Sequence, residues 1–121
     1  MARTLMIVDD SIVIRRLIAR SVSGPDVEVV GTADNGVEAL ELFRNHRPEL
    51  VTMDITMPEM DGLTCVRELL KIDPDTRILV VSALADKPTA VEALKRGALG
   101  YLTKPFTGQE LDRAFAELLQ T

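Results

Sequence analysis

Five polar residues of this sequence stand directly after short apolar runs. They are three aspartates, one serine and one lysine: Asp9, Asp10, Asp54, Ser82 and Lys104. If the apolar runs are parallel β-strands, the carboxyl ends of those strands lie along one edge of the sheet, which is where open α/β folds bind ligands. The sequence therefore predicts that three carboxylates, a hydroxyl and an ammonium group meet in a small area.

Three ionised carboxylates in one place repel each other strongly. At a separation of ~5 Å and an effective dielectric constant of ~20, each pair costs about 3 kcal/mol, so three pairs cost on the order of 10 kcal/mol. That figure is comparable with the stability of a whole domain, and such a cluster needs a cation or must hold protons. Lys104 supplies only one positive charge. Because oxygen ligands favour a hard ion, we expect Mg²⁺ as the cofactor.

The same groups suit the transfer of a phosphoryl group. Asp54 is the candidate acceptor, since a carboxylate can form an aspartyl phosphate. Mg²⁺ and Lys104 would offset charge on the transferring oxygens, Ser82 would donate a hydrogen bond, and Asp9 and Asp10 would hold the metal. Each residue alone has a simpler interpretation, such as a helix cap for the aspartate pair. Their joint placement favours the site.

The elements that must position these residues can be inferred from hydropathy. Apolar runs that are mostly continuous and rich in β-branched residues predict strands buried on both faces, at residues 5–8, 27–30, 50–53, 78–81 and 99–102. A segment with helical periodicity follows each run. The fourth, near residues 88–96, is the weakest, with Val91 and Leu94 as its main apolar residues. Thr107 and Glu110 are spaced as a capping box at the start of the fifth.

This alternation predicts an α/β fold with helices on both faces of a five-stranded parallel sheet. The strand order cannot be derived from the sequence. The order 2-1-3-4-5 of flavodoxin-like, doubly wound (βα)5 folds is the common solution, and we expect it here. The chain of 121 residues has no evident linker or internal repeat and suits one domain, so we expect a single domain over residues 1–121.

Composition limits the classes of partner. The net charge of -5 argues against direct binding of nucleic acid and against an anionic membrane surface. Cys65 is the only cysteine, so no internal disulfide is possible and a reducing compartment fits; we interpret it as a small helix residue. No stretch approaches the roughly 20 apolar residues of a membrane span. We expect a cytoplasmic protein.

Four motifs, taken together in order and spacing, resemble the receiver domains of two-component response regulators. They are residues 7–10 (IVDD), 53–62 (MDITMPEMDG), 81–83 (VSA) and 101–106 (YLTKPF). The match covers essentially the whole chain. With no output domain in the sequence, the chain resembles stand-alone chemotaxis regulators of the CheY type.

The resemblance implies a role for each matching acidic residue. Asp54 would accept the phosphoryl group from a sensor histidine kinase. Asp10 and Asp54 would bind Mg²⁺ directly, Asp9 through a water molecule, and Thr56 through its backbone carbonyl group. The domain would be no enzyme in the usual sense, because it would take part only in its own phosphorylation and dephosphorylation.

The resemblance also implies the parts of a switch. Lys104 would pair with the phosphoryl group, oriented by a cis bond to Pro105. Ser82 would move toward the phosphoryl group and Tyr101 would turn inward, a population shift biased by the added charge. The surface of the fourth helix, fifth strand and fifth helix would change. A flagellar motor switch protein, or another protein target, would bind that surface.

Several alternatives stay open. The chain could be a phosphorelay intermediate, a phosphate sink or a receiver domain cut from a larger regulator. A phosphohydrolase of the haloacid-dehalogenase type also uses an aspartate nucleophile, but it places a second aspartate two residues later, where this chain has Thr56. A flavin-binding module is disfavoured because Asp9 and Asp10 would repel a phosphate in the first loop.

Overall fold

The computed structural model describes residues 2–22, 25–57 and 60–120, and strands alternate with helices throughout this part of the chain. The strands are β1 (Arg3–Val8), β2 (Val27–Ala33), β3 (Leu50–Met53), β4 (Arg77–Ser82) and β5 (Gly100–Thr103). The helices are α1 (Ile12–Val22), α2 (Gly36–His46), α3 (Gly62–Ile72), α4 (Lys87–Lys95) and α5 (Gly108–Gln120). Pro58 and Glu59, which belong to the second motif, lie outside the described residues.

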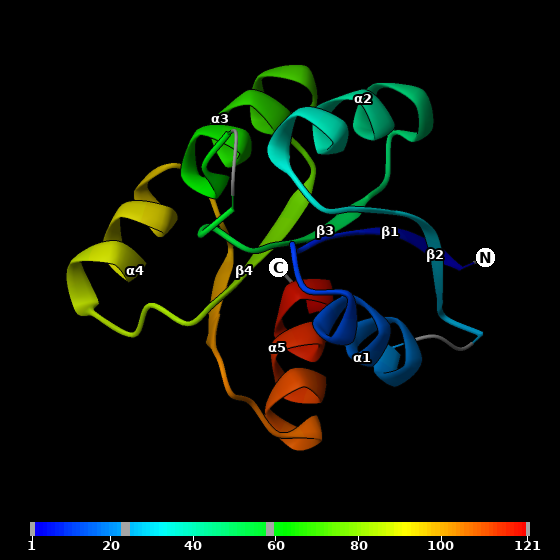
Figure 1. The fold of residues 1–121 in the computed structure, drawn as a ribbon. Coiled ribbons are helices and arrows are strands. Elements are labelled where there is room, and N and C mark those ends of the chain that lie inside the picture. Colours follow the sequence, from blue (N-terminus) through cyan, green and yellow to red (C-terminus); the bar gives the residue numbers. More distant parts are fainter. Residues whose placement is uncertain (1, 23–24, 58–59, 121) are drawn as a thin grey trace.

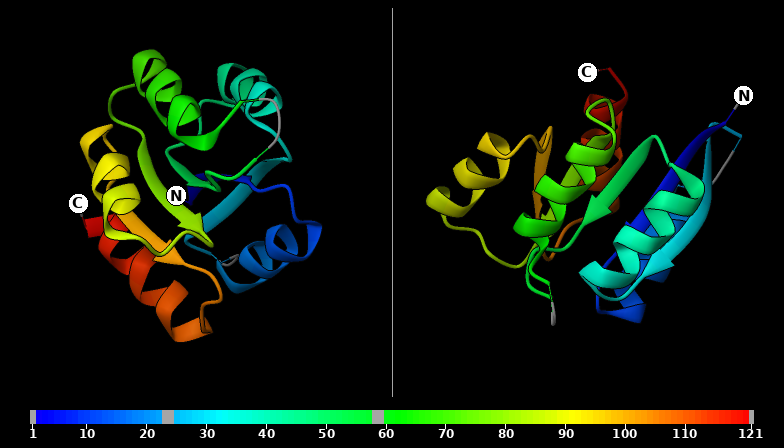
Figure 2. Two further views of the ribbon diagram at one scale, coloured as in Figure 1. Left: turned by 60° about the vertical axis from the view of Figure 1, so that its left-hand side comes forward. Right: turned by 90° about the horizontal axis from the view of Figure 1, so that it is seen from above.

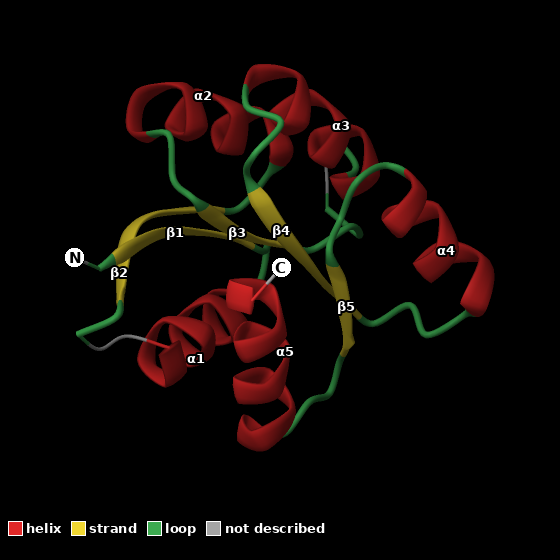
Figure 3. Cartoon of the chain, turned by 180° about the vertical axis from the view of Figure 1, so that it is seen from behind, coloured by secondary structure: helices red, strands yellow, loops and turns green. Residues whose placement is uncertain are grey.

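The strands form one parallel sheet in the order β2-β1-β3-β4-β5, which confirms the predicted fold class and strand order. The sheet is twisted, so that β1 and β5 run in clearly different directions (Figure 3). The register between β1 and β2 shifts once, between Leu5 and Met6. Because all strands are parallel, every strand ends at the same edge of the sheet.

Helices cover both faces of the sheet. One face carries α1 and α5, and the other carries α2, α3 and α4 (Figure 1), an arrangement that the side and top views also show (Figure 2). Successive side chains of a strand point to opposite faces. In β1, Leu5 and Ile7 pack with the residues of α1 and α5, whereas Met6 and Val8 pack with those of α2 and α3. The continuous apolar runs of the sequence therefore supply both cores at once.

Local hydrogen bonds fix where several helices begin. Asn35, Asp61 and Asp86 precede α2, α3 and α4, and the side chain of each accepts a hydrogen bond from a backbone N–H three residues later. The predicted capping box at α5 is confirmed. The Thr107 N–H donates to Glu110 Oε1 at 2.9 Å, and the Glu110 N–H donates to Thr107 Oγ1 at 3.1 Å.

The fourth helix differs from the prediction. Val91 and Leu94, the expected apolar face, are 39% and 50% exposed, and the residue that α4 buries is Ala93. Leu99 was expected in the last strand, but it precedes β5 and is 43% exposed. The small Ala93 side chain lets α4 lie close to the sheet while its larger apolar residues face outward. None of the described helices combines the length and apolar character needed to span a membrane.

Candidate functional site

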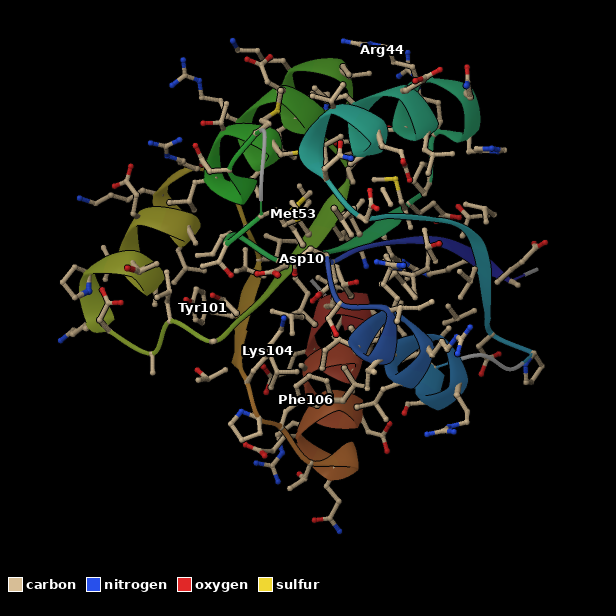
Figure 4. All side chains as sticks on the ribbon, viewed as in Figure 1. Asp10, Arg44, Met53, Tyr101, Lys104 and Phe106 are labelled. Carbon is tan, nitrogen blue, oxygen red and sulfur yellow. The ribbon has the colours of Figure 1, made fainter. Side chains whose placement is uncertain are left out.

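The carboxyl edge of the sheet brings the acidic residues together. Asp9 and Asp10 follow β1, and Asp54 follows β3. Each of the three offers a carboxylate oxygen, and these oxygens all lie within 4.8 Å of one another. Asp9 and Asp54 are each only 1% exposed, whereas Asp10 is open to solvent. Figure 4 labels Asp10 and Lys104, which lie where the chain leaves β1 and β5.

Asp54 is held by the turn that follows it. Its Oδ1 accepts hydrogen bonds from the Thr56 N–H at 3.0 Å and from the Thr56 hydroxyl at 2.9 Å. Its Oδ2 lies 3.4 Å from the Lys104 ammonium group. The Asp54 N–H donates to the carbonyl oxygen of Val8 at 2.9 Å, which ties the end of β3 to the end of β1. The carboxylate is therefore oriented before any ligand binds.

Asp9 is the more deeply constrained member of the aspartate pair. Its Oδ1 accepts the Ser11 N–H at 2.9 Å, and its Oδ2 lies 2.8 Å from the Lys104 ammonium group. Burial raises the pKa of Asp9, and the nearby Asp54 charge raises it further, while the hydrogen bonds from Lys104 and Ser11 oppose this effect. Full ionisation of both buried carboxylates, Asp9 and Asp54, is thus costly without more positive charge nearby.

Lys104 bridges the two buried carboxylates. Its own burial would lower the pKa of the ammonium group, but the Asp9 hydrogen bond and the Asp54 and Asp9 charges outweigh burial and raise that pKa. Lys104 therefore stays protonated at neutral pH. The backbone N–H of Lys104 donates to the Ser82 carbonyl oxygen at 2.8 Å. The peptide bond from Lys104 to Pro105 is cis, as predicted.

The donor set fits a divalent ion. Three carboxylates face one ammonium group, so negative charge remains in excess at the cluster. Every candidate ligand atom is oxygen, which Mg²⁺ prefers, and the exposure of Asp10 leaves room for the water molecules that Mg²⁺ usually keeps. The residues present are therefore suited to Mg²⁺.

Ser82 and Tyr101 both form a hydrogen bond with the backbone of Leu84, two residues after the end of β4. Ser82 is fully buried at the end of β4, and its Oγ accepts the Leu84 N–H at 3.1 Å. The Tyr101 hydroxyl donates to the Leu84 carbonyl oxygen. The Tyr101 ring is half-buried against the core on the α2, α3 and α4 side of the sheet.

Sequence reasoning missed two residues that shape the site. Arg15 donates a hydrogen bond from Nη1 to the Asp9 carbonyl oxygen at 2.6 Å. Gly62 begins α3 so close to the site that a Cβ atom there would lie 2.4 Å from the Asp54 carbonyl oxygen. The signal for Gly62 was its place eight residues after Asp54 in the second motif. Arg15 carried no signal, because a basic residue in a helix usually faces solvent.

Comparison of the sequence with known families and proteins gives one consistent result. The model of the response regulator receiver domain matches residues 5–116. The chemotaxis protein CheY of Thermotoga maritima is 42% identical over 88% of this chain and 88% of its own length. The CheY of Bacillus subtilis is 40% identical over 98% of this chain and 99% of its own. A protein-glutamate methylesterase/protein-glutamine glutaminase of Methanococcoides burtonii is 43% identical over 98% of this chain but only 34% of its own length.

Solved structures share the fold along nearly the whole chain. A chain in the CheX-CheY-BeF3-Mg+2 complex from Borrelia burgdorferi superposes with a TM-score of 0.92 at 28% identity, covering 97% of this chain and 89% of that one. A LuxR-family two-component response regulator from Aurantimonas sp. SI85-9A1 gives a TM-score of 0.91 at 31% identity, covering 99% and 86%. With its fold, its acidic edge and these relatives, the chain belongs to the family of response regulator receiver domains and to two-component signalling.

Proposed function

We propose that residues 1–121 act as one receiver domain, switched by phosphorylation of Asp54. The observation that carries the proposal is the position of the Asp54 carboxylate. It is buried at the carboxyl edge of the sheet, it shares the Lys104 ammonium group with Asp9, and Asp10 lies within ligand distance of the same point. This combination suits a carboxylate that receives a phosphoryl group.

Mg²⁺ is the proposed cofactor. Asp10 and Asp54 would bind it directly, Asp9 would act through a water molecule, and Thr56 would offer its carbonyl oxygen. Once bound, the ion would offset negative charge on the phosphoryl oxygens during transfer. The similar structure from Borrelia burgdorferi is a complex that contains Mg²⁺ and BeF3, which supports this choice.

The donor is a phosphorylated histidine of a sensor kinase. A carboxylate oxygen of Asp54 forms a bond to phosphorus as the phosphorus–nitrogen bond to the imidazole breaks, and the departing imidazole nitrogen takes up a proton. Lys104 pairs with the phosphoryl oxygens and Ser82 donates a hydrogen bond to them. The chain contributes orientation and charge to its own modification and turns over no separate substrate.

The switch connects this chemistry to a protein-binding face. When the Ser82 hydroxyl turns toward the phosphoryl group, it gives up the hydrogen bond from the Leu84 N–H. The Tyr101 hydroxyl is anchored on the same residue, so its ring is released to turn inward. The output face is formed by α4, β5 and α5, and the exposure of the apolar side chains Val91, Leu94 and Leu99 suits it to bind protein.

Relatives that match along most of their own length are named chemotaxis protein CheY, which supports a role in chemotaxis. The domain would act in the cytoplasm, and its proposed target is a flagellar motor switch protein. The methylesterase relatives support an alternative, a receiver domain that regulates an attached enzyme, because one of them matches 98% of this chain at 43% identity within a protein about three times as long. A phosphorelay intermediate and a phosphate sink are further alternatives within the same chemistry. All of them require phosphorylation of Asp54.

Intact mass spectrometry after incubation with Mg²⁺ and acetyl phosphate tests this chemistry. Wild-type protein should gain one labile phosphoryl group, Asp54→Asn should gain none, and chelation of Mg²⁺ should abolish the gain. The matched control is Asp75→Asn, an exposed aspartate before β4 at the opposite edge of the sheet, which should react as the wild type does. A wild-type protein that takes up no phosphoryl group would overturn the proposal.

A pull-down with phosphorylated and unphosphorylated protein tests the output. Phosphorylation-dependent recovery of flagellar switch proteins would support motor control. Recovery of a histidine phosphotransfer protein alone would favour a relay. The variant Asp54→Asn is the control for both arms, since it has no carboxylate at position 54 to accept a phosphoryl group.

A further inference from the structure

Arg15 touches the acidic cluster without being part of it. Its Nη1 donates a hydrogen bond to the backbone carbonyl oxygen of Asp9 at 2.6 Å, and the side chain is half-buried in α1. A hydrogen bond from a charged donor is shorter and stronger than a neutral one. This contact therefore restrains the peptide unit that joins Asp9 to Asp10.

The sequence around this contact explains why it forms. The Ser11 N–H donates to Asp9 Oδ1 at 2.9 Å, which closes a tight turn after β1. Ser11 then caps α1, because its Oγ accepts the Ile14 N–H at 3.3 Å and its carbonyl oxygen accepts the Arg15 N–H at 3.0 Å. The first turn of α1 thus brings Arg15 back over the end of β1. The Asp9 side chain is held at its other oxygen by Lys104.

We propose that Arg15 is a positioning residue for the divalent ion. By holding the Asp9 carbonyl oxygen, it fixes the direction in which the Asp9 and Asp10 carboxylates leave the backbone. The inference rests on the proposed function, because it concerns the same Mg²⁺ site. It goes further by giving a task to a residue that neither binds the ion nor touches the phosphoryl group.

The charge of Arg15 and its positioning role predict opposite changes in Mg²⁺ affinity when the residue is replaced. A guanidinium group near a bound cation repels it, so the loss of the Arg15 charge alone should tighten Mg²⁺ binding. The loss of a group that orients a metal ligand should weaken binding, by about tenfold or more. A neutral substitution at Arg15 therefore separates the two effects by the sign of the change in affinity.

The experiment measures Mg²⁺ dissociation constants of the unphosphorylated protein by isothermal titration calorimetry. Arg15→Met should raise the Kd about tenfold. Arg16→Met, the matched control, removes the same charge from the neighbouring exposed residue and should leave the Kd unchanged or slightly lower. Arg15→Lys, which keeps the charge and one donor group, should recover part of the affinity. An Arg15→Met protein that binds Mg²⁺ as tightly as Arg16→Met would overturn the inference.

A second readout needs no metal. In a chelating buffer, Arg15→Met should increase hydrogen exchange at the Ser11 amide, which donates to Asp9 Oδ1, while Arg16→Met should not. If Arg15→Met does not fold, Arg15→Gln takes its place, since its side chain is polar and neutral but too short to keep the contact. Arg15→Gln should likewise bind Mg²⁺ more weakly than the wild type and exchange the Ser11 amide hydrogen faster. The absence of both effects would overturn the inference.

The outcomes also separate this inference from the proposed function. If the wild-type protein neither binds Mg²⁺ nor accepts a phosphoryl group, both proposals fail. If the wild-type protein does both and the Arg15 variants bind Mg²⁺ normally, only the role of Arg15 is wrong.

Discussion

The Tyr101 hydroxyl donates a hydrogen bond to the Leu84 carbonyl oxygen and thereby fastens the segment after β4 to the edge strand β5. Tyr101→Phe removes this bond and should loosen the segment at a cost of about 0.5–1.5 kcal/mol. Hydrogen exchange over residues 83–86 should be faster than in the wild type, without phosphorylation. Leu84→Ala keeps both backbone groups and is the control that should not change exchange. Unaltered exchange in Tyr101→Phe would show that the hydroxyl does not hold the segment.

The raised pKa of Asp9 makes stability depend on pH in a defined direction. Because the folded-state pKa of Asp9 lies above the ordinary value of an aspartate, the folded protein binds more protons than the unfolded chain between these two pKa values, and its stability falls as pH rises through that window. Asp9→Asn carries no charge to bury. In chelating buffer it should therefore be more stable than the wild type at pH 7, with the gain vanishing below the unfolded-state pKa.

Urea unfolding at a series of pH values measures this difference. If Mg²⁺ binds as proposed, adding it should reduce the stability difference between Asp9→Asn and the wild type, because the ion would stabilise the ionised wild-type cluster. A stability difference that stays constant from acid to neutral pH would contradict the role of Asp9 ionisation.

Gly62 should tolerate no side chain. A Cβ atom there would lie 2.4 Å from the Asp54 carbonyl oxygen and 2.4 Å from Ile55 Cα, so α3 or the turn after β3 must move. Gly62→Ala should lower the free energy of unfolding by about 1–3 kcal/mol and slow phosphorylation of Asp54. Gly108→Ala is the control, because a Cβ at the start of α5 meets nothing within 4 Å. Equal stabilities of the two variants, by urea unfolding, would contradict the close packing.

Thr52 should be replaceable with a gain in stability. It is 1% exposed in β3, and its hydroxyl oxygen has no hydrogen-bond partner among the described residues. Valine has nearly the same shape, so Thr52→Val should raise the free energy of unfolding by about 1 kcal/mol. Thr56→Val is the contrast, since it loses the hydrogen bond to Asp54. A loss of stability in Thr52→Val would reveal a partner for the hydroxyl, such as a buried water molecule.

Cys65 should be unreactive until the protein opens. Burial raises the pKa of its thiol to about 12, and the charges of Asp61 and Glu68 add to the effect. The reactive thiolate is therefore scarce at pH 8. Because this is the only cysteine, the rate of alkylation by iodoacetamide measures the accessibility of the Cys65 thiol directly. Alkylation should accelerate in parallel with urea unfolding; rapid alkylation of the native protein would contradict the burial.

The strands and the acidic edge could be predicted because both depend on simple rules. A strand buried on two faces needs a continuous apolar run, and parallel strands must end at the same edge. Asp9, Asp10 and Asp54 therefore come together wherever such a sheet forms. The strand order could be expected only because it is common among doubly wound folds, since no local pattern specifies which strands are neighbours.

The rest depended on contacts that local sequence does not encode. Val91 and Leu94 resembled a buried helical face, yet the fold buries Ala93 because α4 meets the sheet through its smallest side chain. The hydrogen bond from Arg15 to Asp9 and the double contact on Leu84 arise only after helix and strand have packed. Helical periodicity shows which residues share one face of a helix, but it does not show which face packs against the sheet.

The attachment of α4 sets how cheaply the domain can deform. Its neighbour α3 buries Cys65, Val66 and Leu69, whereas α4 buries Ala93 as its single helical residue in the core. A displacement of α4 therefore takes one helical side chain out of the core, whereas a displacement of α3 would take out at least three. We therefore expect α4 to shift at a lower cost in buried side chains than α3 when the end of β4 changes its conformation.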